Sequence, residues 1–196
     1  MSAEISVVLD ALSQPRWAIL DARDKLPKSL GLYAAHADKA IWEELGLGAA
    51  PDARPLYVGK AEESVVSRDV GTHFSNGRTG SSTLRRSFAA LLRERLLLKG
   101  MPRNPKKPGY FANYGVSEAD DRKLTEWMSR HLLLAAWGAP KGAILMPIEK
   151  AVMRAWLPPL NLKDVVTPWT AQVKAARTVM ADQAREWARR QTPVSA

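Results

Sequence analysis

Two short apolar segments constrain the fold of this chain more than any other feature of its sequence. The first contains Gly31-Leu32-Tyr33, and the second contains Tyr57-Val58-Gly59. Each places a tyrosine close to a glycine in an apolar run, which is typical of a strand that holds a phenol beside open backbone space. Residues 38–54 between them combine one or two helical turns with glycine and proline. The sequence therefore predicts two strands of one sheet, separated by an insertion.

The rest of the chain has mostly helical periodicity. Apolar residues at helical spacing predict helices over residues 5–12, 63–74, 83–98, 117–130, 147–157 and 169–187. The apolar run 132–137 predicts a third strand, whereas residues 17–20 fit either a strand or a turn. We therefore expect an α/β (α+β) domain with a small mixed three-stranded sheet flanked by helices. Its expected parts are an N-terminal helical extension packed on the core (1–29), the core (30–163) and a C-terminal amphipathic helix (164–196).

Length and composition exclude several classes of protein. A chain of 196 residues fits one domain with a substantial core. The absence of cysteine excludes disulfides, thiolate zinc sites and a cysteine nucleophile. The first residues lack the features of a signal peptide, and the apolar run 132–137 is too short to span a bilayer. We expect a soluble, cytoplasmic protein without a membrane partner.

The positive charge is concentrated in one segment. The formal net charge is +9, and residues 78–107 contain nine basic residues and one acid, so this segment carries +8 (nine minus one). Such a concentration suits a polyanion, because neutralised phosphates release condensed counterions. A solvated helix face with a basic loop would have the same composition. We predict a nucleic acid partner, with contacts from Lys60, Arg78, Arg85, Arg86, Arg93, Lys106 and Lys107.

A glycine- and hydroxyl-rich stretch leads into the helix predicted over residues 83–98. Residues 77–83 read Gly-Arg-Thr-Gly-Ser-Ser-Thr, and the serines and the threonine are good helix N-cap residues. Backbone N–H groups and Arg78 could hold a flanking phosphate there. An N-cap with a flexible lead-in explains the same residues without any ligand, and we favour that interpretation.

Four further residues follow the tyrosine segments in an order that suits phosphodiester chemistry. Arg68 and His73 lie on the helix predicted after the second strand, Glu149 lies near the start of a later helix, and Asn161 follows that helix. Cutting a phosphodiester requires an activated water and groups that stabilise the charge of the transition state. Each residue alone also has an ordinary explanation, such as an exposed helix arginine, a helix-start glutamate or a turn asparagine.

Together with the two tyrosine segments, this set resembles the GIY-YIG endonuclease family, metal-dependent enzymes that cut phosphodiester bonds. The resemblance covers about residues 30–162. It implies that Tyr33 or Tyr57 is the general base for the attacking water and that Arg68 grips the scissile phosphate. It also implies that His73 assists, although His73 lies one position further from the arginine than the family pattern has it. Glu149 would carry Mg²⁺ or Mn²⁺.

Two more residues take their roles from the same resemblance. Lys60 would favour the phenolate form of the base, since a free phenol has a pKa near 10. Asn161 matches the polar residue of the Pro-x-Leu-Asn ending, and we expect it to contact the nucleic acid. The 24 positions between the tyrosines (57 − 33) exceed the spacing in minimal members and are similar to that in some restriction enzymes of the family.

The sequence thus predicts a Mg²⁺- or Mn²⁺-dependent endonuclease, with double-stranded DNA favoured as its substrate. Restriction, repair and mobile-element roles all fit, and no zinc finger or helix-turn-helix pattern indicates a target sequence. The alternative is a non-catalytic nucleic-acid-binding module that retains the fold and its basic face. A third interpretation is a basic protein-interaction domain without a nucleic acid partner.

Overall fold

The computed structural model describes residues 3–50, 52–65 and 73–191. Its elements are, in chain order, α1 (Ala3–Ser13), β1 (Trp17–Ala18), α2 (Ile19–Lys25), β2 (Gly31–His36), α3 (Lys39–Glu44), β3 (Tyr57–Ala61), η2 (Thr79–Ser81), α5 (Thr83–Leu91), η3 (Phe111–Asn113), α6 (Glu118–His131), β4 (Leu133–Gly138), α7 (Leu145–Trp156) and α8 (Thr170–Gln191). Within the described part of the chain, no helix is long and apolar enough to cross a membrane.

The sheet has the strand order β1-β4-β2-β3, and every neighbouring pair is antiparallel. The predicted fold class, a small sheet flanked by helices, is confirmed. Two details of the prediction are wrong. The described part of the sheet has four strands rather than three, because the two-residue β1 pairs with β4, and its pairing is antiparallel rather than mixed. β2 lies at the centre and is buried along its whole length, whereas β3 is an edge strand.

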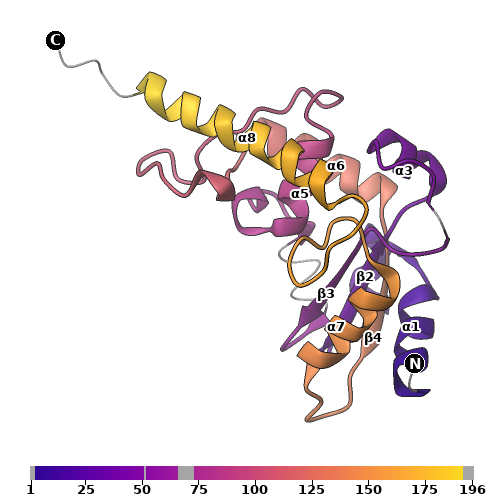
Figure 1. Ribbon diagram of the computed structural model, residues 1–196. Helices are drawn as coiled ribbons and strands as arrows, with labels where there is room; N and C mark the ends of the chain where they lie inside the picture. Colours follow the sequence, from indigo (N-terminus) through magenta and orange to yellow (C-terminus); the bar gives the residue numbers. More distant parts are fainter. Residues whose placement is uncertain (1–2, 51, 66–72, 192–196) are drawn as a thin grey trace.

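Successive residues of β2 point to opposite faces of the sheet and so enter two different cores. Leu32 and Ala34 pack with α1 and α7, which cover one face (Figure 1). Tyr33 and Ala35 belong to the larger core, to which α2, α3, α5, α6 and α8 contribute. The long helix α8 contacts α5 and crosses the end of the molecule away from α7 (Figure 1).

Most predicted helices are present, with different ends. α5 stops at Leu91 instead of residue 98, and the chain then forms turns up to residue 97. The helix predicted over residues 63–74 lies largely outside the described residues. The amphipathic C-terminal helix is present as α8, and it buries Val173, Ala176, Met180 and Ala184.

His36, at the end of β2, has a structural role. Its imidazole is fully buried, and Nε2 donates a hydrogen bond to the Leu12 carbonyl oxygen at 2.9 Å. Burial lowers the pKa of His36 to about 4, so the ring is neutral at physiological pH. The contact ties β2 to α1 on the face opposite the tyrosine cluster.

Candidate active site

The pairing of β2 with β3 brings the two tyrosine segments together. Tyr33 lies opposite Gly59 in the antiparallel register. A Cβ atom on Gly59 would lie 2.4 Å from both Cζ and the hydroxyl oxygen of Tyr33, so the ring of Tyr33 lies directly over the Gly59 backbone. The sequence predicted open backbone space beside a phenol. Gly59 on β3 provides this space for the ring of Tyr33 on the neighbouring strand β2.

A chain of hydrogen bonds leads from Tyr33 into the protein. The Tyr33 hydroxyl lies 2.8 Å from Nε2 of His73, and Nδ1 of His73 lies 2.6 Å from Oγ of Ser82. Ser82 is also the N-cap of α5, because its Oγ accepts a hydrogen bond from the Arg85 backbone N–H at 3.1 Å. The helix start therefore holds the serine, the serine holds the imidazole, and the imidazole holds the phenol.

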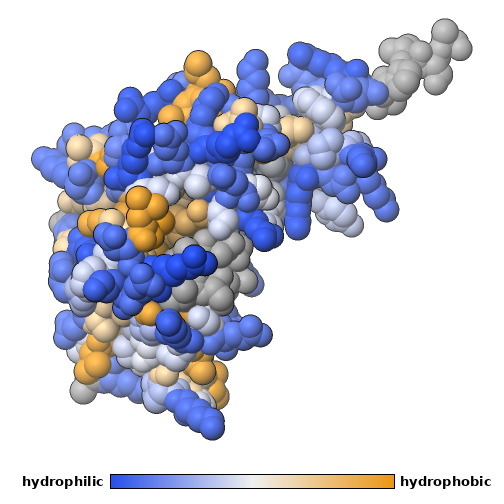
Figure 2. Space-filling view, turned by 180° about the vertical axis from the view of Figure 1, so that it is seen from behind, coloured by the Kyte–Doolittle hydropathy of each residue, from blue (hydrophilic) through white to orange (hydrophobic). Residues whose placement is uncertain are grey.

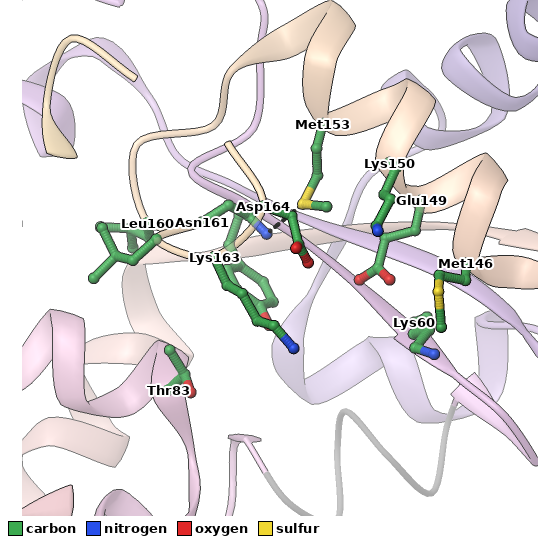
Figure 3. A pocket seen from close by; sticks show the side chains of 12 residues that line it. Lys60, Thr83, Met146, Glu149, Lys150, Met153, Leu160, Asn161, Lys163 and Asp164 are labelled. Carbon is green, nitrogen blue, oxygen red and sulfur yellow. Dashed lines mark hydrogen bonds between the residues drawn. The ribbon is translucent and has the colours of Figure 1, made fainter. Parts of the chain in front are cut away.

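Tyr57 connects this chain to an open cavity. Its ring centroid lies 6.1 Å from that of Tyr33 and 6.3 Å from that of His73. Tyr57 also lines a cavity of about 320 Å³ at the edge strand, together with Lys60, Thr83, Glu149 and the segment 160–164 (Figure 3). Tyr57 therefore contacts the buried rings of Tyr33 and His73 and also borders the cavity that contains the Glu149 carboxylate.

Glu149 is the central acid of this cavity. Burial raises its pKa above the usual value, and the neighbouring carboxylates of Asp164 and Glu62 raise it further, while Lys60 and Lys163 act in the opposite direction. The carboxylates of Glu149 and Asp164 point into the same space (Figure 3). A raised pKa means that the folded protein compensates the negative charge of Glu149 incompletely, which leaves an electrostatic deficit that a cation would relieve.

This acid pair suits a hydrated magnesium ion better than a fully protein-bound metal. Among the described residues, no group of three or more His, Cys, Asp or Glu side chains could hold a metal ion. Mg²⁺ commonly keeps several of its waters and uses only one or two carboxylates. Glu149 and Asp164 therefore fit Mg²⁺ or Mn²⁺, and the donor set does not fit zinc. No motif in the sequence singled out Asp164, which lies in a loop.

Lys60 points into the cavity and pairs with an acid. Its Nζ lies 2.6 Å from the Glu62 carboxylate, and Lys60 lowers the pKa of Glu149. Its neighbours in β3, Tyr57 and Ala61, pack in the core of the tyrosine face. The structure thus connects Lys60 with the acids of the cavity, and its predicted help to a phenolate stays a prediction.

Asn161 fills a structural position that differs from the one expected. Its side chain is 7% exposed, its Oδ1 accepts from the Val58 N–H at 2.9 Å, and its Nδ2 donates to the Val58 carbonyl at 2.8 Å. These bonds satisfy the outer edge of β3 as a neighbouring strand would. The expectation that Asn161 contacts nucleic acid is corrected accordingly, since its amide oxygen and both bonds of Val58 are used inside the fold.

Two of the predicted nucleic acid contacts lie in the interior. Arg85 is fully buried and forms an ion pair with Asp121 at 3.0 Å, so it does not present a charge to solvent. Arg86 is 7% exposed and donates to the Gly80 carbonyl at 2.8 Å. The prediction that Arg86 contacts nucleic acid directly is wrong, because this side chain is buried and α8 contacts the helix that carries it.

The other predicted contacts are at the surface or outside the described residues. Arg78, Lys106 and Lys107 are exposed. Arg93 is half-buried and pairs with Glu94 at 2.8 Å. Arg68 lies outside the described residues, so its predicted grip on the scissile phosphate stays a prediction.

The sequence model of the GIY-YIG catalytic domain matches residues 46–180, which is more than half of the chain. The chain belongs to the GIY-YIG family. Comparisons with curated proteins and with solved structures gave no match. The matched region contains Tyr57, His73 and Glu149 but begins after Tyr33, which the register of β2 nevertheless places against the matched Gly59. The family assignment indicates a nuclease-type function with a nucleic acid substrate.

We expect Gly59→Ala to impair this nuclease by moving Tyr33. The added Cβ would overlap the Tyr33 ring, and a displacement of about 1 Å at a reacting group can cost about 10²-fold in rate. Cleavage rates measure the effect, and circular dichroism checks that the fold persists. Gly109→Ala is the matched control, because its Cβ would meet nothing within 4 Å. Equal activity of Gly59→Ala and the wild type would contradict the placement of Tyr33 at the reaction centre.

Proposed function

We propose that this GIY-YIG nuclease is a Mg²⁺- or Mn²⁺-dependent endonuclease that hydrolyses phosphodiester bonds within double-stranded DNA. The observation that carries the proposal is the hydrogen-bonded chain from Tyr33 through His73 to Ser82, which ends beside the cavity containing Glu149. A phenol that is hydrogen-bonded to an imidazole, near a cavity containing an acid suited to Mg²⁺, is a combination that phosphodiester hydrolysis can use.

In the proposed reaction, Tyr33 takes a proton from the attacking water. The reaction uses the tautomer in which Nδ1–H of His73 donates to Oγ of Ser82, and Nε2 then accepts the proton that the Tyr33 hydroxyl gives up. The phenolate formed in this way is the base, and the proton ends on the imidazole. Ser82 holds the imidazole ring in place, because the position of Ser82 is itself fixed by the start of α5.

The cavity residues supply the charges around the phosphate. Glu149, with Asp164 beside it, would hold the metal ion, which when bound stabilises negative charge on the phosphate and the leaving oxygen. Lys60, Lys150 and Lys163 also line the cavity and attract the polyanionic substrate. Arg68 would complete the grip on the scissile phosphate, as the family resemblance implies.

The direct test is cleavage of supercoiled plasmid by the purified protein in Mg²⁺, Mn²⁺ or EDTA, with Tyr33→Phe in parallel. We expect nicking or linearisation only with metal, and a loss of at least about 10²-fold in Tyr33→Phe because that variant lacks the proposed base. Single-stranded DNA and duplex RNA of equal length test the preference for duplex DNA. Salt-sensitive DNA binding without cutting in any metal would favour the non-catalytic binding module instead.

A further inference from the structure

Three arginines gather behind the start of α5 without an acid among them. Arg86 is 7% exposed, Arg177 of α8 is half-buried, and Arg103 in the loop before η3 is exposed. Among the described residues, none of the three forms an ion pair with a carboxylate. The groups that act electrostatically on Arg86 are Arg177, Arg103 and Tyr114. A buried positive charge without an anionic partner is costly, so this cluster needs an explanation.

The surroundings of Arg86 leave hydrogen-bond donors unused. Nη1 donates to the Gly80 carbonyl at 2.8 Å and Nη2 to Oγ1 of Thr83 at 3.2 Å, but the buried Nε has no hydrogen-bond partner. A guanidinium has five N–H donors, and the two bonds use only two of them. Burial, together with the charges of Arg177 and Arg103, lowers the pKa of Arg86 to about 10. It therefore remains charged at neutral pH.

Arg103 lines a second cavity of about 380 Å³, together with the residues 77–81 of the glycine- and hydroxyl-rich stretch. The stem of Arg103 packs against Gly80, whose carbonyl binds Arg86, so the two arginines meet at this glycine. Two acids also border the cavity. Glu118 pairs with Arg122, and Asp121 is occupied by Arg85. Neither carboxylate forms an ion pair with the three clustered arginines, so neither neutralises their positive charge.

Arg86 also contacts a residue that lines the catalytic cavity. Arg86 contacts Thr83, which lines the cavity of Glu149, and Ser82 beside it holds His73. One turn of α5 thus separates the proposed reaction centre from the arginine cluster. The reverse face of the molecule is largely hydrophilic, with apolar side chains in separate small areas (Figure 2). A strand that leaves the catalytic cavity past Thr83 would meet the arginines next.

We propose that Arg103 and Arg177, above the buried charge of Arg86, form a phosphate-binding site, occupied by a backbone phosphate of the nucleic acid that flanks the bond being cut. Arg103 and Arg177 meet the phosphate at the surface, and Arg86 provides the fixed charge beneath them. Arginine suits this task because its planar fork presents paired donors to phosphate oxygens. The proposal that an anion binds here depends only on the arginine cluster. The proposal that this anion is a phosphate of nucleic acid depends on the nuclease function proposed above.

The test begins with phosphate alone. Thermal unfolding of the full chain is followed in sodium phosphate and in sodium chloride of equal ionic strength. We expect phosphate to raise the unfolding temperature of the wild type but not that of Arg103→Gln/Arg177→Gln. This double variant changes one exposed and one half-buried side chain and leaves Arg86 in place. The control is Lys174→Gln/Arg189→Gln, which removes two charges from exposed positions of α8.

Binding of a labelled DNA duplex in EDTA then identifies the source of the phosphate. A plot of log affinity against log salt concentration has a negative slope, and we expect the magnitude of this slope to decrease by about 1 in Arg103→Gln/Arg177→Gln. The slope should stay unchanged in the control. Selective stabilisation by phosphate with unchanged slopes would support the site but assign it to free phosphate or a nucleotide. Equal responses of all proteins in both assays would overturn it. Because neither assay uses cleavage, a failure of the proposed nuclease activity would be seen separately.

Discussion

Glu149→Gln is expected to reduce cleavage by about 10²–10³-fold while it stabilises the folded protein. The loss of rate follows from the removal of the carboxylate that is proposed to hold the metal. The gain in stability follows from the environment of Glu149, where burial and the nearby Asp164 raise its pKa. At neutral pH the wild type holds a partly buried negative charge that is better solvated in the unfolded chain, and glutamine removes it.

The dependence on pH gives this prediction a definite sign. A carboxyl group with a raised pKa in the folded state binds its proton more tightly there than in the unfolded chain. Its favourable contribution is fully present below the unfolded pKa, about 4.3, and is lost as the pH rises through the folded pKa. The stability gained in Glu149→Gln should therefore grow as the pH rises from 4 to 7.

Urea unfolding at several pH values measures the change, and Glu126→Gln on the exposed surface of α6 serves as the control. Addition of Mg²⁺ should raise the unfolding midpoint of the wild type and have little effect on Glu149→Gln. Equal stability of the two proteins across the pH range, together with equal cleavage, would contradict both the metal site and the electrostatic account of it.

The tyrosine pair shows what the sequence could predict. Each segment carried its own strand signal, and two strands with this spacing pair most simply as neighbours in one antiparallel sheet. The contact between Tyr33 and Gly59 follows from that pairing. For the two-residue β1 the sequence left a strand and a turn open, because its strand character comes from pairing with β4 and not from a clear pattern of its own.

Two features could not be predicted fully from the sequence: the hydrogen-bonded series from Tyr33 through His73 to Ser82, and the exposure of the basic segment 78–107. Ser82 was recognisable as a helix cap, but its bond to His73 depends on how the chain folds back before α5. Helical spacing indicated which residues share a face of α5, but not what would cover that face. α8, some 90 residues later, contacts α5. Local charge density was therefore a poor guide to the exposure of Arg85 and Arg86.

Asp121→Ala is expected to destabilise the protein by about 3–5 kcal/mol, the usual cost of leaving a buried charge without its partner. Asp121 is the only acid that forms an ion pair with the fully buried Arg85 among the described residues, and it also accepts hydrogen bonds from Thr79 and from the Gly77 N–H. Urea unfolding measures the loss. The control is Asp182→Ala, which breaks an exposed pair with Arg185 and should cost less than about 1 kcal/mol.

A second variant separates the buried charge from other effects of the mutation. Arg85→Met/Asp121→Leu removes both charges and should recover much of the stability, because apolar side chains of similar volume can replace a buried ion pair. It should not recover cleavage, since Arg85 also donates to the His73 carbonyl at 2.9 Å and so helps to place the imidazole beside Tyr33. A double variant as unstable as Asp121→Ala would show that the hydrogen bonds of Asp121 to residues 77–79, and not its charge, hold this region together. A double variant that is stable and fully active would show that His73 is positioned without Arg85, through Ser82 alone.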